Sequence, residues 1–187
     1  STDVEAVGED DSCSGDPGDV VFPWRSWKDV PDEPPSWIGR YYVFLEIFAG
    51  KAGLTSSMKT GGVVVLPPVD IVIDGAVEAV ADLKDSSLHK KIQRWIRRGV
   101  VNLLHFGTPC SSFSRARKDD GGPPPLRSED FPAGTPEVLA GALGEDNKQK
   151  CLEGNWFLEI TVGMCRDQSG VGNHWTIENP ANSFMWS

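Results

Sequence analysis

Long apolar runs are missing from this chain of 187 residues, and cysteine and histidine are scarce. No apolar run reaches the roughly 20 residues that a membrane-spanning helix needs, and the first residues lack the pattern of a secretory signal. We therefore expect no membrane partner and an intracellular location, nuclear if the source is eukaryotic. The four cysteines show no spacing typical of a metal site or of a disulfide framework, which favours reduced thiols. We predict no metal site.

The net charge of −9 is concentrated at the start of the chain. Residues 1–40 hold ten acidic and three basic side chains, a net charge of −7. Acidic composition rich in Pro and Gly is typical of disordered segments, so 1–40 is predicted to be an acidic tail or linker, with order beginning at Tyr41. Trp24, Trp27 and Trp37 are candidate docking points on the domain. The remainder is near neutral, so charge does not decide whether it binds nucleic acid.

Apolar runs and amphipathic stretches alternate over 41–187. The expected strands are 41–48, 63–66, 100–106 and 174–177. The expected helices are 54–60, 87–98 and 147–165. This alternation predicts an α/β domain with a mostly parallel sheet. The strands' carboxyl ends would share one edge, where ligands bind in such sheets. Because the chain opens on Ser1 and ends soon after a predicted strand, we expect both ends to be cuts in a longer protein.

The turn after the first strand, 48–53, is rich in glycine. Glycines let the backbone approach a ligand, and the N-terminus of the following helix carries partial positive charge. Asp70 lies 20 residues after Gly50, about where an acid grips ribose hydroxyls in nucleotide-binding α/β folds. A purely structural turn with a surface Asp70 is the alternative interpretation.

The loop after the third strand carries Cys110, preceded by Pro109. At the carboxyl edge of the sheet this thiol is placed to act as a nucleophile, for which it must form the thiolate. The alternative is a small buried apolar residue. Without other motifs, that second interpretation would be favoured.

Glu178 and Asn179 follow the last strand. A carboxylate at the end of a buried strand is costly to leave unpaired, so Glu178 is a candidate acid facing a ligand. The alternative is an acid at the N-terminus of a short helix. In isolation the two interpretations are equally good.

Taken together, the three loops resemble the cytosine-5 DNA and RNA methyltransferase family. Segment 45–50 (Leu-Glu-Ile-Phe-Ala-Gly) is similar to that family's cofactor motif. Segment 109–114 (Pro-Cys-Ser-Ser-Phe-Ser) is similar to its Pro-Cys nucleophile loop, and 178–179 to its Glu-Asn motif. The resemblance covers about 41–187. It implies a Rossmann-like class I S-adenosylmethionine-dependent methyltransferase fold, incomplete at the C-terminus, and so a partial catalytic domain.

The resemblance implies S-adenosylmethionine as the cofactor and a covalent mechanism. The residues expected to line the cofactor are Glu46, Phe48, Ala49, Gly50, Gly53, Asp70, Asp82 and Pro109. Cys110 would attack C6 of cytosine, Glu178 would hold or protonate N3, and Asn179 would brace the loop that carries Cys110. A cytosine in a duplex would have to be flipped out of the stack, at a cost of a few kcal/mol.

Nucleic acid, DNA rather than RNA, is the implied partner. The long loop 114–136 is expected to close over phosphates, with a solvated surface loop as an equal alternative. The expected contacts are Ser114, Arg115, Arg117, Lys118 and Arg127. A second basic stripe on the 87–98 helix is interpreted as an ordinary solvent-facing surface; it comprises Lys90, Lys91, Arg94, Arg97 and Arg98. The region that reads the target is expected in the parent chain, beyond Ser187.

The chain departs from the family pattern at Lys51-Ala52, Ser111 and Pro180, yet none of these positions supplies a reacting group. The rival hypothesis is a degenerate, non-catalytic module that keeps the fold to bind nucleic acid or a protein partner. A tRNA cytosine-5 methyltransferase would use the same site. A dinucleotide oxidoreductase gains support only from the glycine turn and would leave Cys110 and Glu178 unused.

Overall fold

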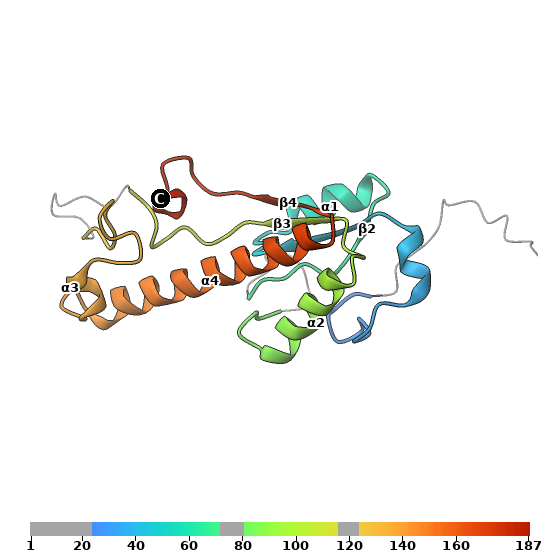
Figure 1. Ribbon diagram of the computed structural model, residues 1–187, viewed down its shortest axis with the longest axis horizontal. Coiled ribbons are helices and arrows are strands. Elements are labelled where there is room, and N and C mark those ends of the chain that lie inside the picture. Colours follow the sequence, from blue (N-terminus) through green and yellow to red (C-terminus); the bar gives the residue numbers. More distant parts are fainter. Residues whose placement is uncertain (1–23, 72–80, 116–123) are drawn as a thin grey trace, which may run out of the picture.

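The computed structural model describes residues 24–71, 81–115 and 124–187, and within them helices alternate with strands (Figure 1). The elements in chain order are η2 (Ser36–Arg40), β1 (Val43–Ile47), α1 (Gly53–Thr60), β2 (Val64–Val65), α2 (Ser86–Arg97), β3 (Leu103–Phe106), α3 (Pro136–Leu139), α4 (Glu145–Gly170), β4 (His174–Ile177) and η3 (Phe184–Trp186). The predicted α/β class is confirmed, with element bounds shifted by a few residues.

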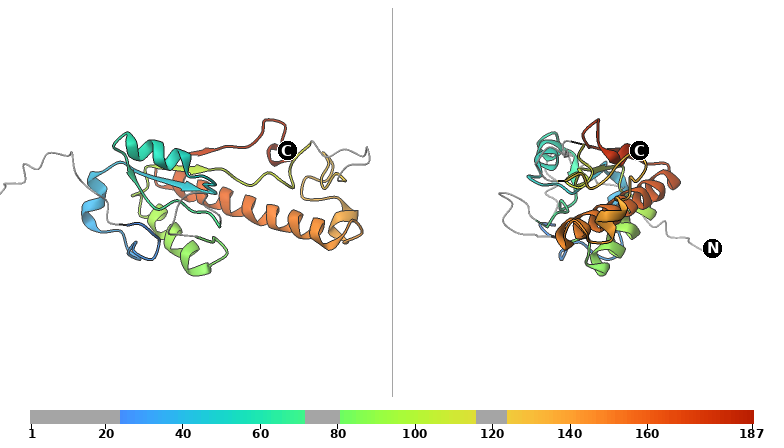
Figure 2. Two further views of the ribbon diagram at one scale, coloured as in Figure 1. Left: turned by 180° about the vertical axis from the view of Figure 1, so that it is seen from behind. Right: turned by 90° about the vertical axis from the view of Figure 1, so that its left-hand side faces the viewer.

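The strands of the described residues form one parallel sheet in the order β2-β1-β3-β4. Val43 pairs with Val64 of β2, Leu45 with Leu104 of β3, and Leu104 in turn with Trp175 of β4. Helix α1 covers one face, and α2 and α4 cover the other (Figures 1 and 2). The predicted parallel sheet is confirmed. The carboxyl ends of β1, β3 and β4 therefore share one edge.

The core lies between the sheet and the α2–α4 pair. All five residues of β1 are buried, as expected of a central strand covered on both faces. Trp95 of α2 and Met164 of α4 are fully buried in the same cluster. Burying a large apolar side chain contributes about 1.5–3 kcal/mol, so this layer is the main source of the fold's stability.

Helix α2 forms where its sequence signals predict. The side chain of Asp85 accepts a hydrogen bond from the backbone N–H of Ser87 at 2.8 Å and caps the first turn. Gly99, with φ of 72°, follows the helix in the left-handed conformation. The buried face of the helix consists of Leu88, Ile92, Trp95 and Ile96, the four residues that the periodicity predicts.

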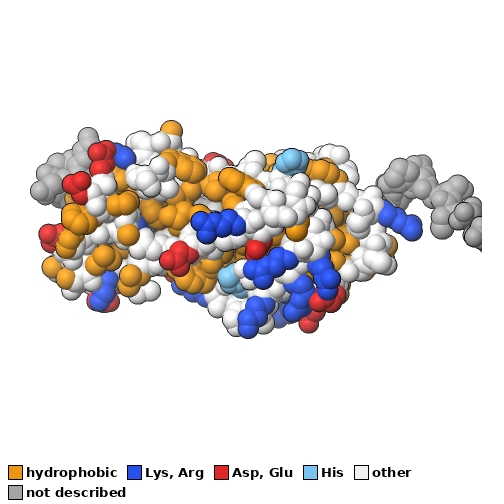
Figure 3. Space-filling view, in the orientation of Figure 1, with side chains coloured by type: hydrophobic (Ala, Val, Ile, Leu, Met, Phe, Trp, Pro, Cys, Tyr) orange, Lys and Arg blue, Asp and Glu red, His pale blue; other side chains and the backbone are white. Residues whose placement is uncertain are grey.

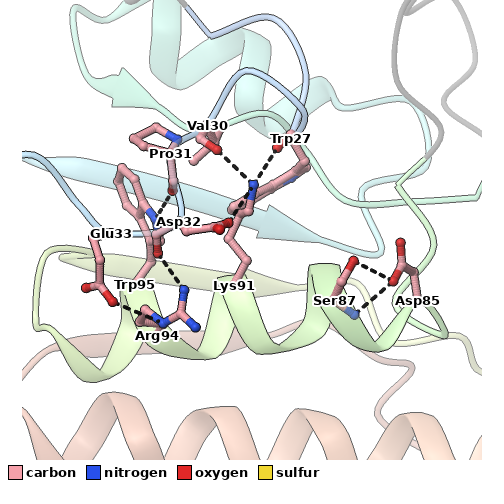
Figure 4. A network of polar contacts seen from close by, with 10 residues as sticks. All are labelled: Trp27, Val30, Pro31, Asp32, Glu33, Asp85, Ser87, Lys91, Arg94 and Trp95. Carbon is pink, nitrogen blue, oxygen red and sulfur yellow. Dashed lines mark hydrogen bonds and ion pairs between the residues drawn. The ribbon is translucent and has the colours of Figure 1, made fainter.

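Residues 24–40 pack on the domain, so the prediction that order begins at Tyr41 is wrong. The indole N–H of Trp27 donates to Pro67 O at 2.8 Å, and that of Trp95 donates to Pro31 O at 3.0 Å. Lys91 of α2 donates to Val30 O at 2.9 Å (Figure 4). Acidic and Pro-rich composition suggested a disordered tail, but buried tryptophan packing outweighs it here. Residues 1–23 lie outside the described residues.

The final strand differs from its prediction as a buried strand. Its residues His174, Trp175 and Thr176 are exposed, and Ile177 is partly buried. β4 lies at the margin of the sheet formed by the described residues, paired to β3 on one side. The apolar residues in its sequence do not by themselves tell whether the strand lies at the margin or in the centre of the sheet.

The basic side chains of α2 pair with acids, which supports their interpretation as an ordinary helix surface. Glu33 accepts ion pairs from Arg94 at 3.3 Å and Arg98 at 3.2 Å, and Asp167 pairs with Arg97 at 3.0 Å. Figure 3 shows Lys and Arg side chains, in blue, gathered over the region of α2, with acidic side chains, in red, beside them. In the described ranges, no helix is both long and apolar enough to span a membrane.

Candidate functional site at the carboxyl edge of the sheet

The three loops singled out in the sequence meet at one edge of the sheet. The backbone N–H of Gly107, at the end of β3, donates to Ile47 O of β1 at 3.0 Å. The N–H of Glu178, after β4, donates to Phe106 O of β3 at 2.8 Å. Parallel pairing thus sets the glycine turn, the Pro-Cys loop and the Glu-Asn motif side by side.

The glycine turn is held in a tight left-handed shape by Asp70. Phe48, Gly50 and Ala52 have positive φ values of 59°, 53° and 51°. The Asp70 carboxylate accepts the N–H of Gly50 at 2.8 Å, and the N–H of Phe48 donates to Val69 O at 2.8 Å. One oxygen of the carboxylate predicted to grip ribose therefore also fixes the backbone of the turn.

Glu46, predicted to line the cofactor, caps the first turn of helix α1. Its buried carboxylate accepts the N–H of Thr55 at 2.7 Å and the hydroxyl of Thr55 at 2.5 Å. Ala52, at the N-cap position, makes no side-chain cap bond, so the acid of β1 satisfies the orphan donor in its place. The sequence motif identified Glu46, but it did not reveal that the carboxylate binds Thr55, nine residues further along the chain.

A cavity of about 210 Å³ opens beside the turn. Four residues predicted to bind the cofactor line it: Phe48, Asp70, Asp82 and Pro109. The rest of its wall consists of Val69, Ile71, Ala81, Leu83, Glu153 and Phe157. The predicted residues Ala49, Gly50 and Gly53 are not among those that line it. An adjoining cavity of about 680 Å³ shares Ala81 and Asp82 with the first.

Two residues of α4, Glu153 and Phe157, were missed as wall residues. They are four apart and so lie on one side of the helix. The rings of Phe48 and Phe157 meet edge to face, with centroids 5.0 Å apart. Glu153 also pairs with Lys84, and this hydrogen bond raises the pKa of Lys84. The i, i+4 spacing was visible in the sequence, but the side of α4 that faces the turn was not.

The loop that carries Cys110 is tied to its surroundings just before the cysteine. The side-chain amide of Asn179 donates to Thr108 O at 2.8 Å, the bracing contact expected of this residue. The hydroxyl of Thr108 meets that of Thr161 on α4 at 3.2 Å. Cys110 itself is a free thiol, partly buried, and its carbonyl accepts the N–H of Phe113 at 2.9 Å. The Glu-Asn motif and the Pro-Cys loop are thus joined by a direct hydrogen bond.

Glu178 is exposed, which corrects the expectation of a carboxylate at the end of a buried strand. Its side chain is 82% exposed, and its Oε2 lies 3.9 Å from Nε2 of His105. The other ring nitrogen of His105, Nδ1, lies 2.8 Å from the hydroxyl of Thr176. His105 was not identified from the sequence, although strand periodicity sets positions 176 and 178 on one face of β4.

The predicted nucleic-acid contacts have different outcomes. Arg115 is exposed and pairs with Glu129 at 2.8 Å, and its guanidinium lies 4.2 Å from the ring centroid of Phe184. Ser114 is partly buried. Arg127 is buried, with 2% of its surface exposed, so its assignment to a phosphate contact is wrong. Arg117 and Lys118 lie outside the described residues.

Among the described residues, no group of three or more His, Cys, Asp or Glu side chains comes together as metal ligands do. The edge therefore offers a thiol, an exposed carboxylate beside a histidine, and a cavity lined by carboxylates and aromatic rings. Comparisons with protein-family models, curated proteins and solved structures gave no match.

Proposed function

We propose that this chain carries the cofactor-binding and cytosine-attacking part of an enzyme that transfers a methyl group from S-adenosylmethionine to C5 of cytosine in DNA, through a covalent bond to Cys110. The observation that carries the proposal is the 2.8 Å hydrogen bond from Asn179 to Thr108 O. It joins the thiol loop to the Glu-Asn motif at the sheet edge where α/β folds bind ligands.

The cavity of about 210 Å³ fits the chemistry of this cofactor in part. Asp70 and Asp82 offer acceptors for hydroxyl and amino groups, and Phe48 and Phe157 offer ring faces and edges to a cationic or aromatic group. The volume lies below the roughly 300–1,000 Å³ of drug-sized ligand sites. The adjoining cavity, which shares Asp82, supplies the remaining room.

The chain's own groups divide the work as follows. The thiolate of Cys110 forms a bond to C6 of cytosine, which moves electron density to C5. Glu178 holds N3, the position where the ring gains charge. S-adenosylmethionine, when bound, would supply the methyl group to C5, with its S–CH3 bond breaking and its sulfur leaving as a neutral thioether. Loss of the C5 proton to a base then lets the bond between C6 and sulfur break, which restores the ring and the thiolate.

Trapping with 5-fluorocytosine tests the proposal, because fluorine at C5 leaves no proton to remove. The protein in its full length is incubated with S-adenosylmethionine and a duplex containing 5-fluorocytosine, and a tRNA oligonucleotide with the same base forms a second arm. We expect a covalent adduct with DNA, mapped to Cys110 by mass spectrometry and absent in Cys110→Ser. Cys165→Ser is the matched control. A folded protein that binds the cofactor and gives no adduct with DNA contradicts the proposal.

The exposure of Glu178 favours one second candidate, a module that keeps the fold and the cavity but performs no methyl transfer. An acid that is 82% exposed lacks the dry surroundings that tune catalytic carboxylates. Calorimetry separates the two candidates. The module predicts binding of nucleic acid with equal affinity by the native protein and by Cys110→Ser, and no adduct from either.

A further inference from the structure

We propose that Arg127 is a positioning residue that holds Ser112, and with it the end of the loop that carries Cys110, against helix α4. This inference rests on the proposed function for the chemistry of Cys110. Arg127 lies outside the residues that line the cavity, so it neither touches the expected cofactor site nor reaches solvent.

The guanidinium of Arg127 donates five hydrogen bonds to four residues: Ser112, Pro132, Cys151 and Asn155. Towards the cysteine loop, Nε donates to Ser112 O at 3.1 Å and Nη2 to the hydroxyl of Ser112 at 3.0 Å. Towards α4, Nη2 donates to Cys151 O at 3.0 Å and Nη1 to Oδ1 of Asn155 at 2.7 Å. Nη1 also donates to Pro132 O at 2.6 Å. A planar fork with five donors is the one side chain that can make all these bonds at once.

The burial of this cation is informative because its acceptors in the described part of the chain are neutral oxygens. Burial without a carboxylate lowers the pKa of Arg127 through desolvation. The face of the guanidinium lies 3.8 Å from the ring centroid of Phe113, which offsets part of that cost. Removing the side chain would leave the acceptors of Ser112 buried without partners, the expensive outcome for buried polar groups. An arginine held in this way favours one shape of the loop.

Gly154 of α4 makes the close approach possible. A Cβ at this position would lie 2.4 Å from the hydroxyl of Ser112 and 3.0 Å from Nη2 of Arg127. The ring of Phe113 would lie 3.1 Å away. Any larger residue therefore pushes against the loop and the guanidinium together, so glycine allows the helix backbone to meet the loop directly.

The hydrogen bonds from Arg127 to Ser112 mean that the loop is held on both sides of Cys110. Before the cysteine, Thr108 is held by Asn179 and Thr161. After it, Ser112 is held by Arg127. Only three residues lie between the two anchors, Thr108 and Ser112, so the position of the thiol depends on both. The sequence could not reveal the second anchor, because Arg127 is 15 residues from Ser112 and reads as a surface charge.

The rate at which iodoacetamide alkylates Cys110 tests whether Arg127 holds the loop, and this test does not depend on catalysis. In a Cys13→Ser background, iodoacetamide rates are measured at each cysteine by peptide mass spectrometry. Cys165, buried in the core with its pKa raised to about 12, reports on the global fold. We expect Arg127→Met to speed the reaction at Cys110 by about tenfold through local opening, with Cys165 unchanged. Arg166→Met, exposed on α4, is the matched control and should leave both rates unchanged.

Gly154→Ala disturbs the same contact while keeping Arg127, and it should also speed Cys110 alone. If Arg127→Met unfolds the protein, the alkylation rates of Gly154→Ala test the proposal instead. A rate at Cys110 within about twofold of native in both variants overturns the proposal, as does a parallel rise at Cys165 in both.

Adduct formation supplies a readout that a merely structural role would not move. Trapping of 5-fluorocytosine by Arg127→Met should slow by about tenfold or more, while the calorimetric Kd for S-adenosylmethionine stays unchanged. Arg127→Lys keeps the charge but has only three donors. A native rate of 5-fluorocytosine trapping in this variant would contradict the need for the five donors of the guanidinium. If the native protein forms no adduct, the proposed function fails, and the alkylation ratios still decide whether Arg127 holds the loop.

Discussion

Strands β1 and β4 carry motifs of similar apparent strength in the sequence, but they occupy different environments. β1 is buried at every residue, and the backbone N–H groups of the turn after it donate hydrogen bonds to Val69 O and to the Asp70 carboxylate. β4 has three exposed residues, and Glu178 after it is exposed as well. The site therefore has a rigid side, which shapes the cavity, and an open side, which presents the acid. The difference is one of side-chain burial: the β1 side is enclosed by the fold, whereas the side chains of β4 and Glu178 face outward.

The largest expected effect comes from the core of the rigid side. Leu45→Ala removes a fully buried side chain from β1 and should lower the free energy of unfolding by about 2–5 kcal/mol. Thr176→Ala, in the exposed β4, should lower it by only about 0.5 kcal/mol. Urea titration followed by tryptophan fluorescence measures both. Equal losses would show that β4 contributes to the core as much as β1 does.

A second substitution tests the contact between the two strands that carry the turn and the thiol. A Cβ at Gly107 would lie 2.7 Å from Phe48 O, so Gly107→Ala must displace the turn. We expect a loss of about 1–3 kcal/mol in stability and a higher Kd for S-adenosylmethionine by calorimetry. Gly163→Ala, in an open position on α4, should instead be neutral or stabilise by up to about 1 kcal/mol. An unchanged Kd for S-adenosylmethionine in Gly107→Ala would mean that the shape of the turn does not affect cofactor binding in the cavity.

The sequence predicted the rigid side better than the open side, for physical reasons. Continuous apolar runs and a capped amphipathic helix depend on local pattern, so β1, β3 and α2 formed where expected. β4 was misjudged because burial depends on neighbouring strands, not on its own residues. The contact of Glu46 with Thr55 was missed and Arg127 was misassigned, because these partners, Thr55 and Ser112, lie 9 and 15 residues away. Residues 24–40 were misjudged because tryptophan packing outweighed acidic composition.

The core beneath the rigid side also predicts a dependence of stability on pH. Burial raises the pKa of Cys165 from about 9 to about 12. The neutral thiol is thus favoured by folding, and its contribution is fully present below pH 9 and is lost as the pH rises towards 12. Urea midpoints measured from pH 8 to 11 should fall more steeply for the native protein than for Cys165→Ala. Parallel curves would mean that water reaches the thiol.

The smallest expected effect belongs to the open side. Glu178→Gln keeps the size of the side chain and removes the charge near His105, from which its Oε2 is 3.9 Å away. Because the carboxylate is 82% exposed, solvent screens this pair, and the free energy of unfolding should change by less than about 0.5 kcal/mol. Trapping of 5-fluorocytosine should nevertheless slow, because an amide cannot give a proton to N3 as a carboxylic acid can. Loss of stability without loss of trapping would make Glu178 a structural partner of His105. Loss of trapping with unchanged stability would mean that Glu178 acts on the target cytosine. The nucleic acid would then bind at the exposed, β4 side of the sheet edge and cover Glu178.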